Sequence, residues 1–391
     1  MATRTPRWVL LAAVVLVAIN LRAVITSVPP VVLQIQDSLG LGDVAIGLLT
    51  TLPVLCMGLF ALAVPSVAAR FGRQQTVWAA LALLFIAMAM RFAGYVPGVL
   101  QVSVVIGGIG IAFAAGLVPG IVREQMPESI GRATGVWSAA MFTGAALGAA
   151  LTVPLASLLG SWQEALGAWC IPAAIAFVVW TIVERPYRRT RDDAPARVRL
   201  QSLPWRSGPA WALTAYMALN SIVFYSAVAW IAPSLEERGW SASTSGWLFG
   251  LFAAAQIAGG LLLAPLSHRL QRRRAFFVFL ICLDIPVLLL LGFAPGFLTA
   301  AVLFVFGMAH SGAFAVSLSM LSEFSADAAA SARLTAMAFF VTYVLAAFGP
   351  ALSGVVLART DSWAAVYSFL AIVAVFQIPS IWPLRRGLVI A

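Results

Sequence analysis

Twelve long apolar runs, separated by short polar segments, dominate this sequence of 391 residues. Each run is close to or beyond the roughly 20 residues that an α-helix needs to cross the hydrocarbon core of a bilayer. Hydrophobic residues make up 62% of the chain and charged residues only 10%, whereas a soluble domain carries about 25% charged residues. The sequence therefore predicts an all-α membrane protein with most of its surface facing lipid.

The apolar runs give the limits of twelve expected transmembrane helices. Connections as short as residues 95–97 force consecutive helices to run antiparallel. The expected helices are 8–30, 44–68, 75–94, 98–122, 133–158, 165–183, 209–233, 243–266, 275–294, 296–321, 332–358 and 363–384.

The 24 basic residues, which are all arginine, predict the orientation. If the N-terminus is cytoplasmic, all but four of them lie on the cytoplasmic side; Arg91, Arg238 and Arg359 fall at outer ends and Arg22 falls within the first span. This bias predicts a bacterial inner-membrane protein with both termini in the cytoplasm. The first run is too long for a signal peptide and is expected to remain as the first span. The net charge of +10 is therefore assigned to topology, and no nucleic-acid partner is expected.

The two halves of the chain repeat one another at a spacing of about 200 residues. The segment ending at Asn20 recurs at Asn220, and Gly107 recurs as Gly307. This predicts two pseudo-symmetric six-helix bundles of parallel topology, with a substrate site at the midplane between them. The expected divisions are an N-terminal bundle at 1–183, an Arg-rich cytoplasmic linker at 184–208 and a C-terminal bundle at 209–391.

An inner loop in each half carries an eroded helix 2–3 signature. The first copy spans 65–74 and the second 265–274; their signature residues are Arg70, Gly72, Arg73, Arg269 and Arg273. With the repeat, these loops make the chain resemble a major facilitator superfamily transporter. The resemblance implies a gating role for the loops, although Ala69 replaces the usual aspartate and leaves the charge relay in doubt.

Three further segments resemble the cyanate and nitroimidazole transporter branch of that superfamily. They are 20–27 in the first span, 135–141 in the fifth and 343–350 in the eleventh. The resemblance implies alternating-access transport of cyanate or a related small anion, or else of a nitroimidazole-like heterocycle. The rival within transport is a proton-coupled multidrug or toxic-compound efflux pump, and the rival of another class is a channel or membrane sensor.

Arg22 is the strongest candidate for substrate recognition. It has no counterpart in the second half, where the equivalent position is Ile222. A cation within a span costs about 2.5–3.5 kcal/mol on insertion scales and marks a functional site, and its planar fork matches oxyanions. The alternative is a permanent internal salt bridge, for which no acid at matching depth is obvious in the sequence.

Two more polar residues without a counterpart in the other half are candidates for substrate contact or proton coupling. His310 in the tenth span aligns with Gly110 when the two halves are compared. It could bond substrate or titrate near neutral pH. Asp284 in the ninth span aligns with Leu84 in the repeat; it lies just before Pro286, so its carboxyl is expected either to be protonated or to bond a backbone group freed by the proline. Asp284 is therefore the weaker proton-coupling candidate.

The remaining candidates contribute polar or aromatic groups to the expected cavity. Thr26 shares a helical face with Arg22, whereas Asn20 and Ser27 lie roughly opposite. Because Asn20 recurs as Asn220, an interhelical hydrogen bond is as good an interpretation as a ligand contact. The full set of expected substrate contacts is Arg22, Thr26, Asn20, Ser27, His310, Tyr225, Trp137, Tyr343, Asn220 and Met141.

No nucleotide loop, metal-spaced His/Cys set or nucleophile triad occurs in the sequence. Enzymatic activity, a cofactor and a metal are therefore not expected. The expected partners are a small-molecule substrate, the lipid bilayer and H⁺ as a possible coupling ion, and the protein is expected to be a monomer.

Overall fold

The computed structural model describes residues 7–96, 98–125, 130–184, 203–263, 266, 273–293, 296–326 and 328–384. Within these residues the secondary structure is helical, with no β-strand. The first half comprises α1 (Arg7–Thr26), η1 (Pro29–Val31), α2 (Val32–Leu39), α3 (Asp43–Ala61), α4 (Val64–Phe71), α5 (Arg73–Ala89), η2 (Met90–Ala93), α6 (Val99–Gln125), α7 (Ile130–Leu159), α8 (Trp162–Ala168) and α9 (Cys170–Glu184). The second half comprises α10 (Gly208–Glu236), α11 (Ala242–Ala258), η6 (Gly259–Leu263), α13 (Arg273–Phe293), η7 (Gly296–Leu298), α14 (Thr299–Glu323), α15 (Ala328–Ala346), α16 (Phe348–Thr360), α17 (Trp363–Val375) and α18 (Gln377–Ser380).

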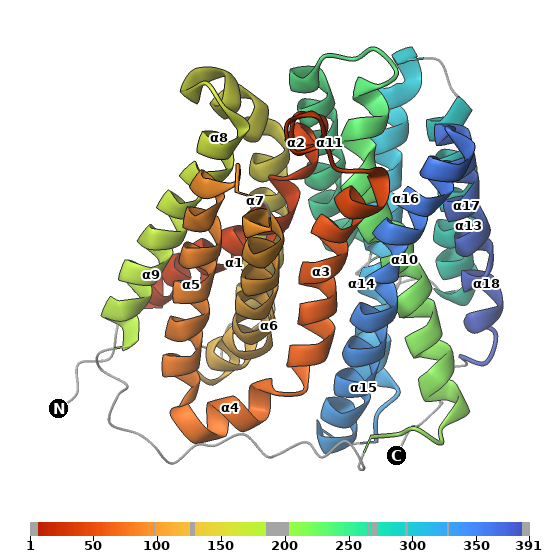
Figure 1. Ribbon diagram of the computed structural model, residues 1–391. Coiled ribbons are helices and arrows are strands. Elements are labelled where there is room, and N and C mark those ends of the chain that lie inside the picture. The colour runs from red at the N-terminus through yellow and green to blue at the C-terminus, as the bar shows by residue number, and fades with distance from the viewer. Residues whose placement is uncertain are drawn as a thin grey trace.

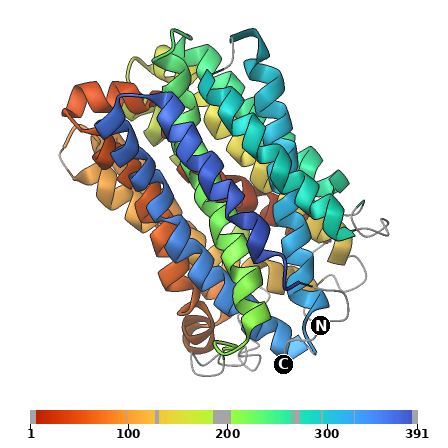
Figure 2. The same cartoon turned by 90° about the vertical axis from the view of Figure 1, so that its right-hand side faces the viewer.

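Twelve helical segments of the described chain are long and apolar enough to cross a membrane. Figure 1 shows them packed side by side, with α5, α8 and α9 at one side of the molecule and α13, α17 and α18 at the other. Figure 2 shows the same bundle after a quarter turn, with α13 and α17 now towards the viewer. The predicted twelve-helix membrane fold is confirmed.

Several spans are broken in ways that hydropathy did not predict. The first continues past residue 30: α1 ends at Thr26, η1 begins at Pro29, and α2 ends at Leu39. Because a proline has no backbone N–H, Pro29 and Pro30 interrupt the α-helical ladder. The short η1 that results packs against α7, α10 and α11. The break therefore lies where the two halves of the chain meet, close to the end of α1.

Glycines allow the two halves to approach closely along two seams. On one seam, a methyl group added to Gly246 of α11 would lie 2.9 Å from the carbonyl oxygen of Ala149 in α7. On the other, one added to Gly58 of α3 would lie 2.8 Å from the backbone nitrogen of Val344 in α15. Such small-residue contacts are the usual packing mode of membrane helices.

The internal repeat also appears as matching contacts within each half. A methyl group added to Gly148 of α7 would lie 2.6 Å from the Thr26 hydroxyl of α1. In the second half, one added to Gly349 of α16 would lie 2.7 Å from the Ser226 hydroxyl of α10 and 2.8 Å from the Ile222 carbonyl oxygen. The first span of each half is thus held against its fifth in the same way, even though Ile222 occupies the position of Arg22.

Candidate functional site

Arg22 lies on α1, one turn before the helix ends. Its side chain is partly buried, and its Nη1 donates a hydrogen bond to the hydroxyl of Tyr225 on α10 at 3.4 Å. The guanidinium carbon lies 5.3 Å from the ring centre of Phe224 and 6.0 Å from that of Tyr225. These distances are within the range of a cation–π contact. Among the residues that the structure describes, no carboxylate pairs with Arg22.

Thr26, one turn beyond Arg22, is buried and is used by the helix itself. Its Oγ1 donates to the carbonyl oxygen of Arg22 at 3.0 Å and sits against Gly148 of α7. This hydroxyl therefore already bonds within α1, and its contact with substrate stays a prediction.

Asn20 joins α1 to α9. Its Nδ2 donates to the carbonyl oxygens of Leu16, at 2.8 Å, and of Pro172, at 3.1 Å. The side chain is completely buried and its Oδ1 has no hydrogen-bond partner. These contacts match the interhelical role that the sequence left open, and a ligand role for Asn20 stays a prediction.

Ser27 meets a second intramembrane cation, Arg91 of η2. The Arg91 side chain is completely buried; its Nη1 donates to Ser27 Oγ at 3.1 Å and its Nη2 to the Val24 carbonyl oxygen at 2.8 Å. It therefore satisfies a carbonyl at the C-terminus of α1, where a cation is also favoured by the helix dipole. Arg91 lies at the end of the third span, as expected, but its guanidinium turns inward onto the end of α1; that this end is the outer one stays a prediction.

His310 of α14 and Asp284 of α13 form a buried pair. His310 Nδ1 and Asp284 Oδ2 are 2.6 Å apart, and both side chains are at most 3% exposed. The amide Nδ2 of Asn220 lies 3.5 Å from the same imidazole nitrogen. The expected bond from Asp284 to a backbone group freed by Pro286 is wrong, since the carboxylate bonds His310 and its other oxygen has no partner.

Phe224 connects the histidine to the arginine. Its ring stacks on the His310 imidazole with a centroid distance of 6.2 Å and an interplanar angle of 13°, and it also lies under the Arg22 guanidinium. The sequence interpretation did not single out Phe224. The repeat could have identified it, because the equivalent position in the first half is Val24.

The other predicted substrate contacts, Tyr343, Trp137 and Met141, divide into two groups. The ring of Tyr343 on α15 lies 6.4 Å from that of Tyr225, so these two tyrosines and Arg22 form one cluster. Trp137 of α7 is buried and Met141 is half-buried; both pack against the hydrophobic core, and neither forms a hydrogen bond or ring contact with Arg22. Their role as substrate contacts stays a prediction.

The first inner-loop motif forms a tight connection between α4 and α5. Gly72 has φ +91° and ψ 146°, a conformation that only glycine adopts readily. Its carbonyl accepts from Thr76 Oγ1 at 2.7 Å, and the Arg70 guanidinium lies 5.2 Å from the ring of Phe71. Arg73 begins α5.

The second copy of the motif is described only in part. Arg269 lies outside the described residues, and Arg273 is placed only as the first residue of α13. The gating role of both copies stays a prediction.

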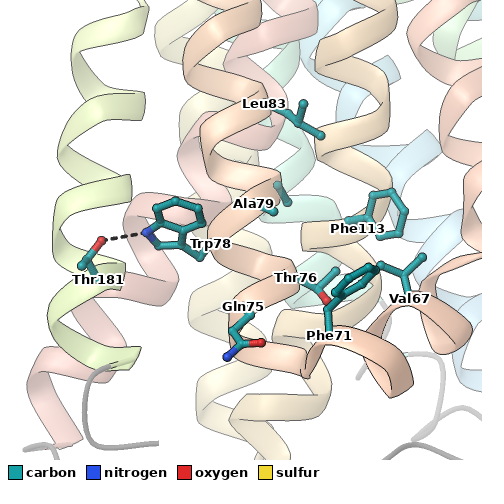
Figure 3. A pocket seen from close by; sticks show the side chains of 10 residues that line it. Val67, Phe71, Gln75, Thr76, Trp78, Ala79, Leu83, Phe113 and Thr181 are labelled. Atoms are coloured by element: carbon teal, nitrogen blue, oxygen red, sulfur yellow. Dashed lines mark hydrogen bonds between the residues drawn. The ribbon is translucent and has the colours of Figure 1, made fainter. Parts of the chain in front are cut away.

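A surface hollow of about 640 Å³ lies among α4, α5, α6 and α9, and neither Arg22 nor the His310–Asp284 pair lines it. Figure 3 shows its lining, in which the Trp78 Nε1 donates to Thr181 Oγ1 at 3.1 Å. The lining side chains include no charged group and none of the predicted substrate contacts. It therefore suits hydrocarbon better than a polar solute. No cluster of three or more His, Cys, Asp or Glu that could hold a metal ion is found in the described part of the chain.

Comparison with known proteins gives consistent matches over nearly the whole chain. Residues 10–241 and 218–386 each match the family model described as the Major Facilitator Superfamily. The 2-nitroimidazole transporter of Escherichia coli (strain K12) is 34% identical over 376 residues, covering 95% of this chain and 94% of the relative. The cyanate transport protein CynX of the same organism is 29% identical over 372 residues, covering 94% of each. The uncharacterized transporter YycB of Bacillus subtilis (strain 168) is 31% identical over 359 residues, covering 90% of this chain and 88% of the relative.

Solved structures share the fold. A bacterial homologue of the human lysosomal transporter Spinster, in an inward-facing and occupied conformation, superposes with a TM-score of 0.74 at 18% identity and covers 96% of this chain and 94% of that chain. A D-xylose–proton symporter superposes with a TM-score of 0.74 at 16% identity, covering 95% of this chain and 96% of that one. At such identities the likeness concerns the fold alone.

Proposed function

This chain belongs to the major facilitator superfamily of transporters, and we propose that it moves a small polar or anionic solute across the bacterial inner membrane by alternating access. The observation that carries the proposal is Arg22, a guanidinium inside the bilayer that no described carboxylate neutralises. Its substrate would supply the missing negative charge or an equivalent pair of acceptor oxygens.

The hydrogen bonding of Arg22 to its protein neighbours is weak. One hydrogen bond of 3.4 Å to a neutral hydroxyl is long for an N–H···O bond, for which about 2.7–3.2 Å is typical. An arginine with five donors therefore keeps most of its hydrogen-bonding capacity. A chain that retains such a costly group without an internal partner gains from it when an oxyanion binds in the fork.

The chemistry of the site narrows the substrate class. Arg22 sits beside the rings of Phe224 and Tyr225, and Tyr343 adjoins the latter. A fork flanked by aromatic faces suits small, flat or linear groups with delocalised charge. Cyanate and a nitroimidazole both meet this description, and proteins named for transport of each are relatives of this chain. We therefore take a cyanate-like anion as the first substrate class and a nitroimidazole-like heterocycle as the second.

The arrangement of helices supports rocking of one bundle against the other, with the divisions at 1–183, 184–208 and 209–391 that the sequence predicts. The two glycine-lined seams run along α7–α11 and α3–α15, and Arg22 lies near the junction where η1 meets α10. An even number of spans puts both termini on one side, and the arginine distribution makes that side the cytoplasm. We infer that the protein works as a monomer, since each chain holds both halves of the site.

A proton-coupled efflux pump for more apolar compounds is the second candidate. The observation that favours it is the buried His310–Asp284 pair, flanked by the rings of Phe224 and Phe306. Efflux predicts that expression in a sensitive host raises resistance to a toxic heterocycle. Uptake of an anion predicts accumulation of that anion in the same cells.

Counterflow in proteoliposomes tests the main proposal directly. Vesicles preloaded with unlabelled cyanate or 2-nitroimidazole should transiently accumulate the labelled compound, which a channel would not do. Arg22→Gln should abolish this exchange and Arg22→Lys, which lacks the fork, should weaken it. Arg359→Gln is the matched control, because Arg359 is an exposed arginine in the last turn of α16. If Arg22→Gln exchanges as fast as Arg359→Gln, recognition by Arg22 is refuted.

A further inference from the structure

The His310–Asp284 pair is placed as a proton-binding site would be. Both groups are titratable, both are buried inside the second half of the chain, and they share one short contact of 2.6 Å. Each also keeps one buried atom without a partner, Oδ1 of Asp284 and Nε2 of His310. Leaving a buried polar atom without a partner costs about 1–3 kcal/mol. Both atoms are positions at which these side chains bind a proton.

The surroundings of the pair contain few other titratable groups. From α10, the hydroxyl of Tyr216 interacts electrostatically with Asp284 and the neutral amide of Asn220 faces His310. Neither α11 nor η6, which both pack on α14, carries a titratable side chain. On α13 packs α17, which carries Tyr367, and the Tyr367 hydroxyl bonds Ser234 of α10. On α14 packs α15, which carries Arg333 near its start and Tyr343, whose ring adjoins that of Tyr225. The cation Arg22 is connected to the pair through Phe224, whose ring contacts both Arg22 and His310.

The distances place the pair within electrostatic reach of the anion site. The Arg22 guanidinium lies 5.3 Å from the Phe224 ring centre, and that ring centre lies 6.2 Å from the imidazole centre. The two groups are thus no more than about 12 Å apart, about one and a half Debye lengths in physiological salt, and buried groups are screened much less. A charge added at the pair is therefore felt by an anion bound at Arg22.

We propose that the His310–Asp284 pair is the proton-binding site of this transporter and that proton binding there favours anion binding at Arg22, which makes the protein a proton–anion symporter. This inference rests on the proposed function, since it needs an anion at Arg22. The pair gains one H⁺ from water on the side where substrate enters and returns it to water on the other side. Whichever atom holds the proton, the pair becomes more positive by one charge.

The sign of the coupling follows from that charge. One additional positive charge within about 12 Å, at an effective dielectric constant of about 20, changes anion affinity by roughly tenfold. Affinity for the anion therefore rises as the pH falls through the titration range of the pair. By linkage, anion binding must favour protonation by the same factor. A proton gradient that is acidic on the side of entry would thus drive accumulation of the anion.

Proteoliposomes with an imposed pH gradient test the proposal, with labelled cyanate as the probe. Wild-type protein should accumulate cyanate when the outside is more acidic than the inside. Asp284→Asn keeps an acceptor oxygen for the histidine and should exchange cyanate in counterflow but lose gradient-driven accumulation. Asp37→Asn is the matched control, since Asp37 is an exposed carboxylate of α2.

The outcomes separate the two proposals. Gradient-driven accumulation by Asp284→Asn equal to that of Asp37→Asn overturns the proton site and leaves recognition by Arg22 standing. Absence of any exchange of cyanate or 2-nitroimidazole by the wild type overturns the proposed function instead.

A measurement that needs no transport tests the proton site even if the wild type exchanges neither compound. The chain has two histidines, so a His268→Gln protein carries His310 alone and its labelled imidazole can be followed by NMR. The signal should change with pH, and the change should be altered by Asp284→Asn. A signal that stays constant between about pH 5 and pH 9 in both proteins refutes the proton site whatever the substrate is.

Discussion

Arg22 and Arg91 both lie within membrane-spanning segments, and the structure predicts opposite effects of removing them. Arg22 and Arg91 are each within a span, but Arg91 is fully buried with two well-formed hydrogen bonds, whereas Arg22 makes one long bond to a hydroxyl. We expect Arg22→Gln to preserve the stability of the ligand-free protein and to abolish its stabilisation by ligand. We expect Arg91→Gln to lower stability and to leave stabilisation by ligand intact.

The magnitudes for Arg22 nearly cancel. Removing the cation recovers about 2.5–3.5 kcal/mol of insertion cost. It forfeits two ring contacts, each worth about 0.5–2 kcal/mol, and one weak hydrogen bond worth at most about 1 kcal/mol. No described carboxylate is left without a partner, so the large penalty for breaking a buried ion pair does not arise. The net change in the free energy of unfolding should lie within about 1 kcal/mol of zero.

The magnitudes for Arg91 do not cancel. Its two hydrogen bonds come from a charged donor and are worth about 1.5–3 kcal/mol each. Their loss also leaves the Val24 carbonyl and the Ser27 hydroxyl buried without a donor. Against this stands the recovered cost of burying a cation, so we expect a net loss of about 2–4 kcal/mol.

Thermal melting of the purified protein with a thiol-reactive dye measures both effects, since Cys56 is buried and becomes reactive on unfolding. A ligand at 100 times its Kd stabilises the protein by about 2.7 kcal/mol. A panel of small anions and nitro-heterocycles should include one compound that raises the Tm of the wild type and of Arg91→Gln, but not of Arg22→Gln. The reasoning is refuted if Arg22→Gln melts as low as Arg91→Gln and still responds to that compound.

Three other substitutions test the packing described above. Gly144→Ala should lower the Tm through at least about 1–3 kcal/mol of overpacking, because the added methyl group would clash with the carbonyl oxygen of Ile19 in α1; Gly135→Ala, with nothing within 4 Å, should be neutral. Asn20→Ala should cost about 1–3 kcal/mol of stability through its lost interhelical bond, yet leave the Kd for cyanate unchanged; a changed Kd with unchanged Tm would favour a ligand role. Gly72→Ala should cost about 1–3 kcal/mol through its positive φ, whereas Gly120→Ala, which has open space and an ordinary φ, should not.

The fold could be predicted from the sequence because the bilayer imposes simple requirements on it. Length and hydropathy give the twelve spans, and the repeat gives the relation between the halves. Helix breaks were predicted less well, because a sliding count of apolar residues is insensitive to backbone geometry. The prolines at 29 and 30 were visible, but nothing in the sequence indicated that α2 continues to Leu39 or that α15 and α16 divide at Ala347.

The sequence was enough to predict which charged residues belong to the candidate site, but not which contacts they make. Comparing the halves isolated Arg22, His310 and Asp284, but it could not reveal that the last two form a pair on adjacent helices. The same comparison, applied more widely, would have found Arg91, whose counterpart is Leu291, and Phe224. Which of Arg22 and Arg91 makes the shorter hydrogen bonds depends on side-chain geometry, and no sequence pattern encodes it.

The division of the site between the halves has a consequence for the transport cycle. Arg22 belongs to the first half of the chain, whereas Phe224 and the His310–Asp284 pair belong to the second. Rocking of the two bundles would therefore change the distance from Arg22 to Phe224 while the pair stays intact. Because electrostatic coupling falls with distance, we expect proton and anion to favour one another most in the conformation where Arg22 lies on Phe224. A coupling that depends on conformation in this way is what a symporter needs, since both ligands must then be released together on the other side of the membrane.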